Sequence, residues 1–169
     1  MVYFCQTLEE FKNLKAKLAW KSLGLVPTMG NLHQGHLSLL ENALLENDVA
    51  LVTIYVNPKQ FAQGEDFSEY PRTLEDDLNK IEGLSQKIKG DKSEVIVFSP
   101  KSDDEIYPKG GFKSLSAGKL GKILEGEIRP THFDGVLTVV YRLLDMFRPT
   151  NAYFGKKDFQ QLALISMMA

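Results

Sequence analysis

The chain has 169 residues, of which 43% are hydrophobic and 25% are charged, a composition typical of one globular domain rather than of a disordered or fibrous protein. Its 20 Lys and Arg residues against 22 Asp and Glu residues give a formal charge of -2, which argues against nucleic acid or an anionic membrane as a partner. Cys5 is the only cysteine, so an internal disulfide and a cysteine-rich zinc site are excluded and a reducing, cytoplasmic location is expected.

The sequence at the two ends of the chain differs in what it indicates. Residues 1–6 lack the basic stretch and apolar run of a signal peptide, and no stretch is apolar for long enough to span a membrane. The last residues, 165–169, have the composition of an apolar helix without a stop signal. We therefore expect the chain to be cut short at Ala169.

The first half of the chain predicts one strand-helix-strand unit after an initial helix. Thr7 followed by Glu10 has the pattern of a capping box, and apolar residues at helical spacing predict a surface helix over 7–19. A short apolar run predicts a buried strand over 22–27, and helical periodicity returns over 34–46. The β-branched run at 49–56 is typical of a parallel strand covered on both faces.

The second half repeats this alternation. The pattern predicts a helix starting near Thr73, a strand over 94–98, a long buried helix over 132–147, a fourth strand over 151–154 and a helix over 158–168 with Asp158 at its start. Two segments, 85–93 and 101–111, are expected to be exposed loops because neither has a usable apolar period. Together the elements predict an α/β, doubly wound, Rossmann-like parallel sheet with its ligand crevice at the carboxyl ends of the strands.

All three histidines lie at junctions that contain glycine or proline. His33 and His36 lie between a predicted strand and a predicted helix, where free backbone N–H groups and the helix dipole favour a phosphate. Gly30 and Gly35 would let a ligand approach the backbone closely. The alternatives are a capping turn with surface histidines, or a metal pair whose third ligand would be His132 or a carboxylate.

Four segments carry a resemblance to one family. Residues 27–36 resemble the phosphate-binding HxGH element of the nucleotidyltransferase-like superfamily, in the form typical of the pantothenate synthetase (pantoate-beta-alanine ligase) family. The other matches, in family order, are residues 56–61 with 65–66 and 70–73, residues 124–126 with 129–136 and 138–140, and residues 154–162. The resemblance covers essentially the whole chain.

The resemblance implies an ATP-dependent condensation of pantoate with β-alanine through a pantoyl adenylate, releasing AMP and pyrophosphate. It implies roles in ATP binding for Met29, His33, His36, Gly155, Lys157 and Asp158, of which the two histidines and Lys157 would be catalytic. Gln60 and Gln161 would bind pantoate, because an amide can donate to a carboxylate and accept from a hydroxyl. Each of these residues also has an ordinary alternative as a surface amide, a helix cap or a solvated charge.

Three further residues are less well defined by the resemblance. Tyr70 is either part of the core or a lid over the substrate. Asp76 and Asp77 are either a solvated helix start or candidates for a Mg²⁺ site, with Lys80 as an unfavourable positive neighbour. The family is commonly a homodimer, so a second copy is an expected partner.

One departure from the family falls between Arg129 and His132. The family usually has glycine where this chain has Thr131. If that position requires a positive φ, a β-branched residue costs energy there and alters the local loop.

Members of the family continue into a smaller C-terminal lid domain that is absent from this sequence. Residues 1–169 are therefore expected to form the N-terminal nucleotide- and pantoate-binding domain. Two alternative functions remain: an isolated ATP- or pantoate-binding module with little activity, and a nucleotidylyltransferase acting on another small acid.

Overall fold

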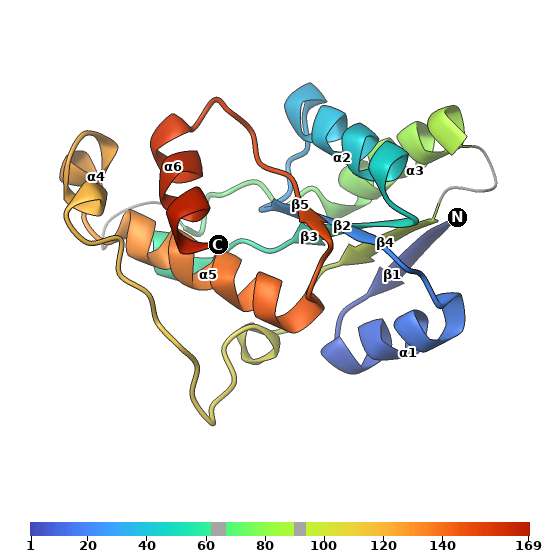
Figure 1. Ribbon diagram of the computed structural model, residues 1–169, viewed down its shortest axis with the longest axis horizontal. Coiled ribbons are helices and arrows are strands. Elements are labelled where there is room, and N and C mark those ends of the chain that lie inside the picture. The colour runs from blue at the N-terminus through green and yellow to red at the C-terminus, as the bar shows by residue number, and fades with distance from the viewer. Residues whose placement is uncertain (62–66, 90–93) are drawn as a thin grey trace.

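A computed structural model describes residues 1–61, 67–89 and 94–169 (Figure 1). The five strands are β1 (Val2–Cys5), β2 (Leu23–Thr28), β3 (Val49–Ile54), β4 (Glu94–Phe98) and β5 (Asn151–Ala152). The α-helices in the described residues are α1 (Leu8–Leu18), α2 (Gln34–Glu46), α3 (Leu74–Lys89), α4 (Glu125–Ile128), α5 (His132–Phe147) and α6 (Phe159–Met168). Short 3-10 turns lie at η1 (Pro58–Gln60), η3 (Asp103–Glu105) and η4 (Leu120–Lys122). None of the helices in these three stretches is long and apolar enough to cross a membrane.

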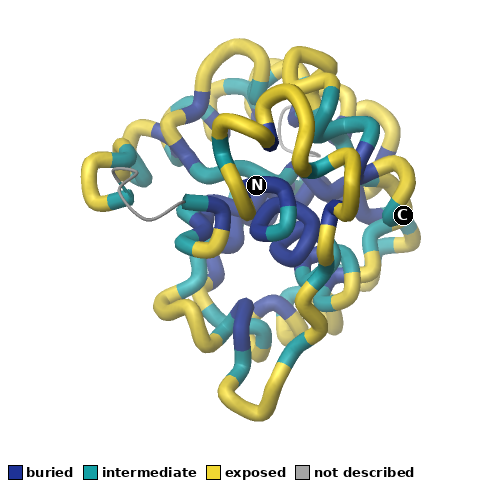
Figure 2. The backbone as a smooth tube through the Cα atoms, turned by 90° about the vertical axis from the view of Figure 1, so that its left-hand side faces the viewer, coloured by how far each residue is buried: buried dark blue, intermediate teal, exposed yellow. Residues whose placement is uncertain are grey.

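The strands form one parallel sheet in the order β1-β4-β3-β2-β5, with helices on both faces (Figure 1). Alternate strand residues divide the interior into two cores: α2 and α3 pack on one face, and α1, α5 and α6 on the other. Figure 2 shows the buried residues gathered in the centre of the molecule and the exposed ones around it. From β2 the strands β3 and β4 are added toward one edge of the sheet, whereas β5 pairs with the other side of β2. This change in the order of the strands places a crevice at the carboxyl end of β2.

The predicted doubly wound parallel fold is confirmed, and several predicted elements match closely. The capping box at the start of α1 is present, with Thr7 Oγ1 accepting from the Glu10 N–H at 3.1 Å and Glu10 accepting from the Thr7 N–H at 3.2 Å. The bounds of α2, β4 and α5 are those expected. The prediction missed β1, which pairs with β4 at the edge of the sheet, because its four residues are too few to show a period.

The two predicted loops are partly wrong. Helix α3 continues to Lys89 and buries Ser85, while residues 90–93 lie outside the described residues. In the second segment, Ile106 and Tyr107 are buried in the core beneath a 3-10 turn, where both of their N–H groups donate to the Asp103 carbonyl. A single turn is too short for its apolar residues to repeat, so no period marked it in the sequence.

Candidate functional site

A cavity of about 180 Å³ lies beyond the carboxyl ends of β2, β3 and β5. Its walls come from the segments that follow these three strands, from Tyr70 and from one face of α5. It is lined by Pro27, Thr28, Met29, His36, Tyr55, Asn57, Gln60, Tyr70, Val136, Val139, Val140, Leu143, Phe154, Asp158 and Gln161. Segments far apart in the sequence thus bring six of the expected site residues to one cavity: Met29, His36, Gln60, Tyr70, Asp158 and Gln161.

The two histidines of the first motif are held in one tautomer by the backbone. His33 is the N-cap of α2, and its Nδ1 accepts from the Gly35 N–H at 3.0 Å. The Nδ1 of His36 accepts in turn from the His33 N–H at 3.4 Å, and the two rings stack with centroids 4.1 Å apart. A ring nitrogen that accepts cannot carry the proton, so in each neutral imidazole the proton is on Nε2. Each Nε2–H group can then act as a hydrogen-bond donor toward an anion.

Burial lowers the pKa of His36 from its ordinary value, and the neighbouring His33 lowers it further, whereas the charges of Asp77 and Asp158 act in the opposite direction. His36 is therefore mainly neutral near pH 7 and acts there as a hydrogen-bond donor rather than as a fixed positive charge. A bound phosphate would favour its protonated form.

Three backbone N–H groups of the same junction are already engaged, although the sequence predicts free N–H groups there. The Gly30 N–H donates to Thr28 Oγ1 at 3.1 Å. The Asn31 and Leu32 N–H groups donate to the carboxylate of Asp77 at 2.9 and 2.7 Å. In this junction an anion would therefore be bound by imidazole side chains and not by these three amides.

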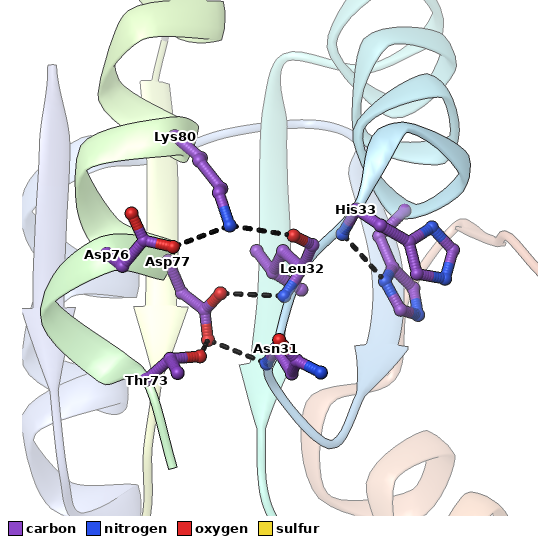
Figure 3. A network of polar contacts seen from close by, with 8 residues as sticks. Asn31, Leu32, His33, Thr73, Asp76, Asp77 and Lys80 are labelled. Atoms are coloured by element: carbon purple, nitrogen blue, oxygen red, sulfur yellow. Dashed lines mark hydrogen bonds and ion pairs between the residues drawn. The ribbon is translucent and has the colours of Figure 1, made fainter. Parts of the chain in front are cut away.

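The predicted magnesium ligands lie behind the junction and do not fit a metal ion. Asp77 is fully buried on α3, and its two oxygens accept from Asn31, Leu32 and Thr73 Oγ1 (Figure 3). Asp76 faces the solvent and forms an ion pair with Lys80 at 2.6 Å. Among the described residues no three His, Cys, Asp or Glu side chains gather as a metal site. We therefore derive no step through a metal ion bound by these two carboxylates.

The amide of Asn57, buried beside the cavity, is oriented by the backbone. Its Oδ1 accepts from the Lys59 N–H at 3.2 Å and from the Tyr107 hydroxyl at 2.7 Å. Its Nδ2 donates to the Gly135 carbonyl at 3.1 Å and to Oε1 of Gln60 at 3.2 Å. Because a backbone N–H can only donate and a backbone carbonyl can only accept, neither end of the Asn57 amide can be exchanged.

The orientation of Asn57 fixes that of Gln60, which is 8% exposed. With its Oε1 occupied by Asn57, Gln60 directs its Nε2 toward the cavity, where it lies 2.9 Å from the Sδ of Met29. A thioether is a weak acceptor, so this donor is available to a ligand oxygen. Gln161, half-buried at the start of α6, lines the same cavity.

Arg129 and His132 stand behind Gln60. The Nδ1 of His132 lies 2.8 Å from the Gln60 carbonyl oxygen, and Arg129 Nη1 lies 3.2 Å from Nε2 of the same ring and 3.2 Å from the Glu125 carboxylate. Between them Thr131 has a φ of 71°, so the left-handed conformation considered from the sequence is present. A β-branched residue is strained in that conformation.

The segment after β5 supplies the remaining expected residues. Asp158 is the N-cap of α6, but its side chain makes no capping hydrogen bond, so its carboxylate is not used by the helix. Gly155 and Lys157 are exposed next to Phe154 and Asp158, which line the cavity. This segment therefore lies at the rim of the cavity, but Gly155 and Lys157 are not among the residues that line it.

Sequence reasoning missed two kinds of residue in the cavity wall. Tyr55 and Asn57 lie within three residues of the end of β3, and Asn57 belongs to the family motif at 56–61, so their position at a strand end was a usable signal. The apolar side chains of α5 gave no such signal, because the helix is apolar on most of its surface. They are Val136, Val139, Val140 and Leu143.

Comparison with known proteins agrees with this geometry. Residues 3–169 match the family model described as pantoate-beta-alanine ligase. The pantothenate synthetase of Aquifex aeolicus is 49% identical over 148 residues, covering 88% of this chain and 49% of that protein. That of Staphylococcus haemolyticus is 41% identical over 170 residues, covering 99% of this chain and 57% of that protein.

Solved structures give the same result. A pantothenate synthetase from Thermus thermophilus superposes with a TM-score of 0.85 at 41% identity, covering 99% of this chain and 56% of that one. A pantoate-beta-alanine ligase from Francisella tularensis, solved in complex with beta-gamma ATP and beta-alanine, has a TM-score of 0.85 at 36% identity and covers 99% of this chain and 62% of that one. The chain spans about half the length of the curated relatives it matches.

Proposed function

Because the chain belongs to the pantoate-beta-alanine ligase family, we propose that it is the nucleotide- and pantoate-binding domain of an enzyme that condenses pantoate with β-alanine at the expense of ATP. In the first step, a carboxylate oxygen of pantoate attacks the α-phosphorus of ATP, and pyrophosphate leaves. In the second step, the amine of β-alanine attacks the acyl carbon of the pantoyl adenylate, loses a proton and expels AMP. Neither step needs a nucleophile from the protein, so positioning and charge stabilisation are the tasks of the side chains.

The observation that carries the proposal is the single cavity that combines a histidine donor, two glutamines and an apolar wall. Pantoate has a carboxylate, two hydroxyl groups and a carbon bearing two methyl groups. The inward-facing Nε2 of Gln60 suits the carboxylate or another acceptor oxygen, Gln161 suits a hydroxyl, and the α5 wall suits the methyl groups. Tyr70, which is half-buried in the wall beside Phe61, would cover the substrate from the remaining side.

The nucleotide would lie across the β2 and β5 ends of the cavity. His33 and His36 would donate through Nε2 to the phosphates and stabilise the charge that builds on the departing pyrophosphate. Lys157 would add a compact positive charge, and the uncapped carboxylate of Asp158 would accept from the ribose hydroxyls. The backbone of Met29 and the open position of Gly155 would allow the nucleotide to approach closely. Magnesium would enter with the phosphates of ATP, since Asp76 and Asp77 are engaged in other contacts.

The proposal also includes a homodimer in the cytoplasm, carried over from the family resemblance. Size-exclusion chromatography with light scattering tests it, because a dimer has twice the chain mass. A monomer at every concentration would contradict this part and leave the site assignment unchanged.

Pantoate-dependent exchange of labelled pyrophosphate into ATP tests the central proposal. The assay uses the 169-residue chain with magnesium and without β-alanine, beside a His33→Ala/His36→Ala double variant. Exchange above that variant would mean that the domain forms the adenylate by itself. No exchange, with ATP or pantoate still binding in calorimetry, would mean that it is a binding domain that needs a further part for catalysis. Binding of neither ligand would overturn the proposal.

A further inference from the structure

The segment from Met29 to His36, here called the histidine loop, joins β2 to the first turn of α2 and has two residues with positive φ directly after Met29. Gly30 has a φ of 83° and Asn31 a φ of 51°. A turn can direct successive backbone N–H groups toward the same side and so create a small concave site for a negative charge. In this loop the N–H groups of Asn31 and Leu32 converge on one carboxylate, that of Asp77.

Asp77 comes from a different element, the first turn of α3, and is fully buried. One oxygen accepts from Leu32 at 2.7 Å, and the other accepts from Asn31 at 2.9 Å and from Thr73 Oγ1 at 3.2 Å (Figure 3). A Cβ added at Gly30 would lie 3.1 Å from the same carboxylate, so the space at that glycine is already taken by Asp77. The carboxylate thus fills the concave site of the loop from behind.

Lys80, one turn further along α3, makes a second contact with the loop. Its Nζ donates to the Leu32 carbonyl at 3.0 Å and pairs with Asp76 at 2.6 Å (Figure 3). Both backbone groups of Leu32 are therefore bound by α3 side chains, and Leu32 directly precedes His33. Asp77 and Lys80 do not line the cavity.

We propose that Asp77 is the positioning residue of the histidine loop, and that Lys80 assists it, so that α3 sets the direction in which the His33 and His36 donors face the ATP phosphates. The proposal rests on the proposed function for the identity of the anion. Asp77 acts through the loop backbone and not through a bound metal ion, in contrast to the expectation from the sequence that Asp76 and Asp77 would together bind magnesium.

The two adjacent carboxylates give a matched test. Asp77→Asn keeps the size of the side chain but replaces an acceptor oxygen with a donor group, whereas Asp76→Asn removes the same charge from an exposed neighbour that pairs with Lys80 and makes no direct contact with the loop in the structure described. Ile81→Val, on the buried face of α3, serves as a destabilised control that leaves the loop contacts in place. The readouts are hydrogen exchange of the Asn31 and Leu32 amides by NMR, and ATP and pantoate affinities by calorimetry, all on the 169-residue chain.

For Asp77→Asn we expect the two amides to exchange at least tenfold faster and the affinity for ATP to fall at least tenfold, with pantoate affinity within twofold of the unmodified chain. Asp76→Asn and Ile81→Val should change neither the amides nor the ratio of the two affinities. If Asp77→Asn does not fold, Lys80→Met removes the hydrogen bond to the Leu32 carbonyl and the ion pair with Asp76 but keeps the Asp77 contacts, and we expect it to weaken ATP binding by threefold to tenfold with pantoate binding unaffected.

Unchanged amide exchange in Asp77→Asn would overturn the proposal whatever the protein binds. Faster exchange with unchanged ATP affinity would overturn the positioning role, as would equal losses for ATP and pantoate. Equal, magnesium-dependent losses of ATP affinity in Asp76→Asn and Asp77→Asn would establish a metal site in its place. If the unmodified chain bound neither ligand, the proposed function would fail, and the exchange measurement would decide the loop contact alone.

Discussion

Asn57 donates a hydrogen bond to Oε1 of Gln60 at 3.2 Å, and this contact decides which end of the Gln60 amide faces the cavity. Asn57 is itself oriented by a backbone N–H on one side and a backbone carbonyl on the other. Gln60 is therefore a donor toward any ligand, so the cavity favours a molecule that presents an acceptor oxygen at this point.

Gln60→Glu tests this orientation. The glutamate has nearly the same shape and can keep the contact with Asn57, but it turns an oxygen in place of an N–H group toward the pantoate carboxylate. Two like charges about 4 Å apart near a protein surface repel by about 4 kcal/mol, so we expect at least a tenfold loss of pantoate affinity in calorimetry. Gln86→Glu, on the exposed side of α3, is the control and should leave the affinity unchanged. Unaltered binding by Gln60→Glu would mean that the carboxylate of pantoate lies elsewhere.

Tyr107→Phe tests the same orientation of Gln60 through Asn57, the residue that contacts both Tyr107 and Gln60. The hydroxyl of Tyr107 donates to Asn57 at 2.7 Å, and Tyr107 is not among the residues that line the cavity. A hydrogen bond of this kind contributes about 0.5–1.5 kcal/mol, so a roughly twofold to tenfold loss of pantoate affinity is expected, with ATP affinity unchanged. Equal weakening of both ligands would point to a general loss of structure.

The stability of the chain should depend on pH through His36. Burial and His33 lower the pKa of this imidazole in the folded state, so between the folded and unfolded pKa values the unfolded chain binds more protons. Stability therefore falls as the pH drops through about 6.5, the ordinary pKa of histidine. We expect denaturant titrations at neutral and mildly acidic pH to show a smaller loss for His36→Gln than for the unmodified chain. The same loss in both would assign the pH dependence to other groups.

Thr131→Gly should stabilise the protein. Thr131 has a φ of 71°, a conformation that costs an L-residue roughly 1–2 kcal/mol and glycine little, although glycine loses more entropy on folding. We expect a net gain of about 1 kcal/mol in the free energy of unfolding, which corresponds to a Tm increase of about 2–4 °C for a chain of this size. Thr131→Ala keeps a Cβ and should gain less. A lower Tm for the glycine variant would show that the threonine side chain makes a contact that outweighs the strain.

Two glycine-to-alanine changes should have opposite effects. A Cβ at Gly135 on α5 would collide with the Lys59 carbonyl and lie 2.6 Å from the Gln60 nitrogen, so the η1 turn must move, at a cost of about 1–3 kcal/mol. Gly83 on α3 has nothing within 4 Å, and alanine there should add about 0.5–1 kcal/mol of stability. Thermal unfolding measures both, and pantoate affinity should fall only for Gly135→Ala. Retained affinity in that variant would mean that the displacement does not reach the Gln60 side chain.

Local patterns in the sequence determined the fold class and much of the site. Three elements were predicted from such patterns and are present in the structure: the capping box at Thr7, the β-branched strand β3 and the long apolar helix α5. The HxGH motif gave the histidines, and the resemblance gave both glutamines. These features follow from neighbouring residues, so they are visible without knowledge of what packs against them.

Tertiary structure decided the tasks of the polar groups. Asp76 and Asp77 are adjacent in the sequence and were considered together as magnesium ligands. In the structure the first faces the solvent and the second lies in the core, because a helix turns adjacent side chains in different directions. In the junction expected to bind phosphate, the N–H groups of Asn31 and Leu32 donate to the carboxylate of Asp77, which lies 46 and 45 residues further along the chain. Which end of Gln60 faces the cavity depends on Tyr107 and Gly135, which only the folded chain brings to Asn57. Hydrogen-bond partners are set by position in space, and a sequence pattern specifies only the residue types that can make them.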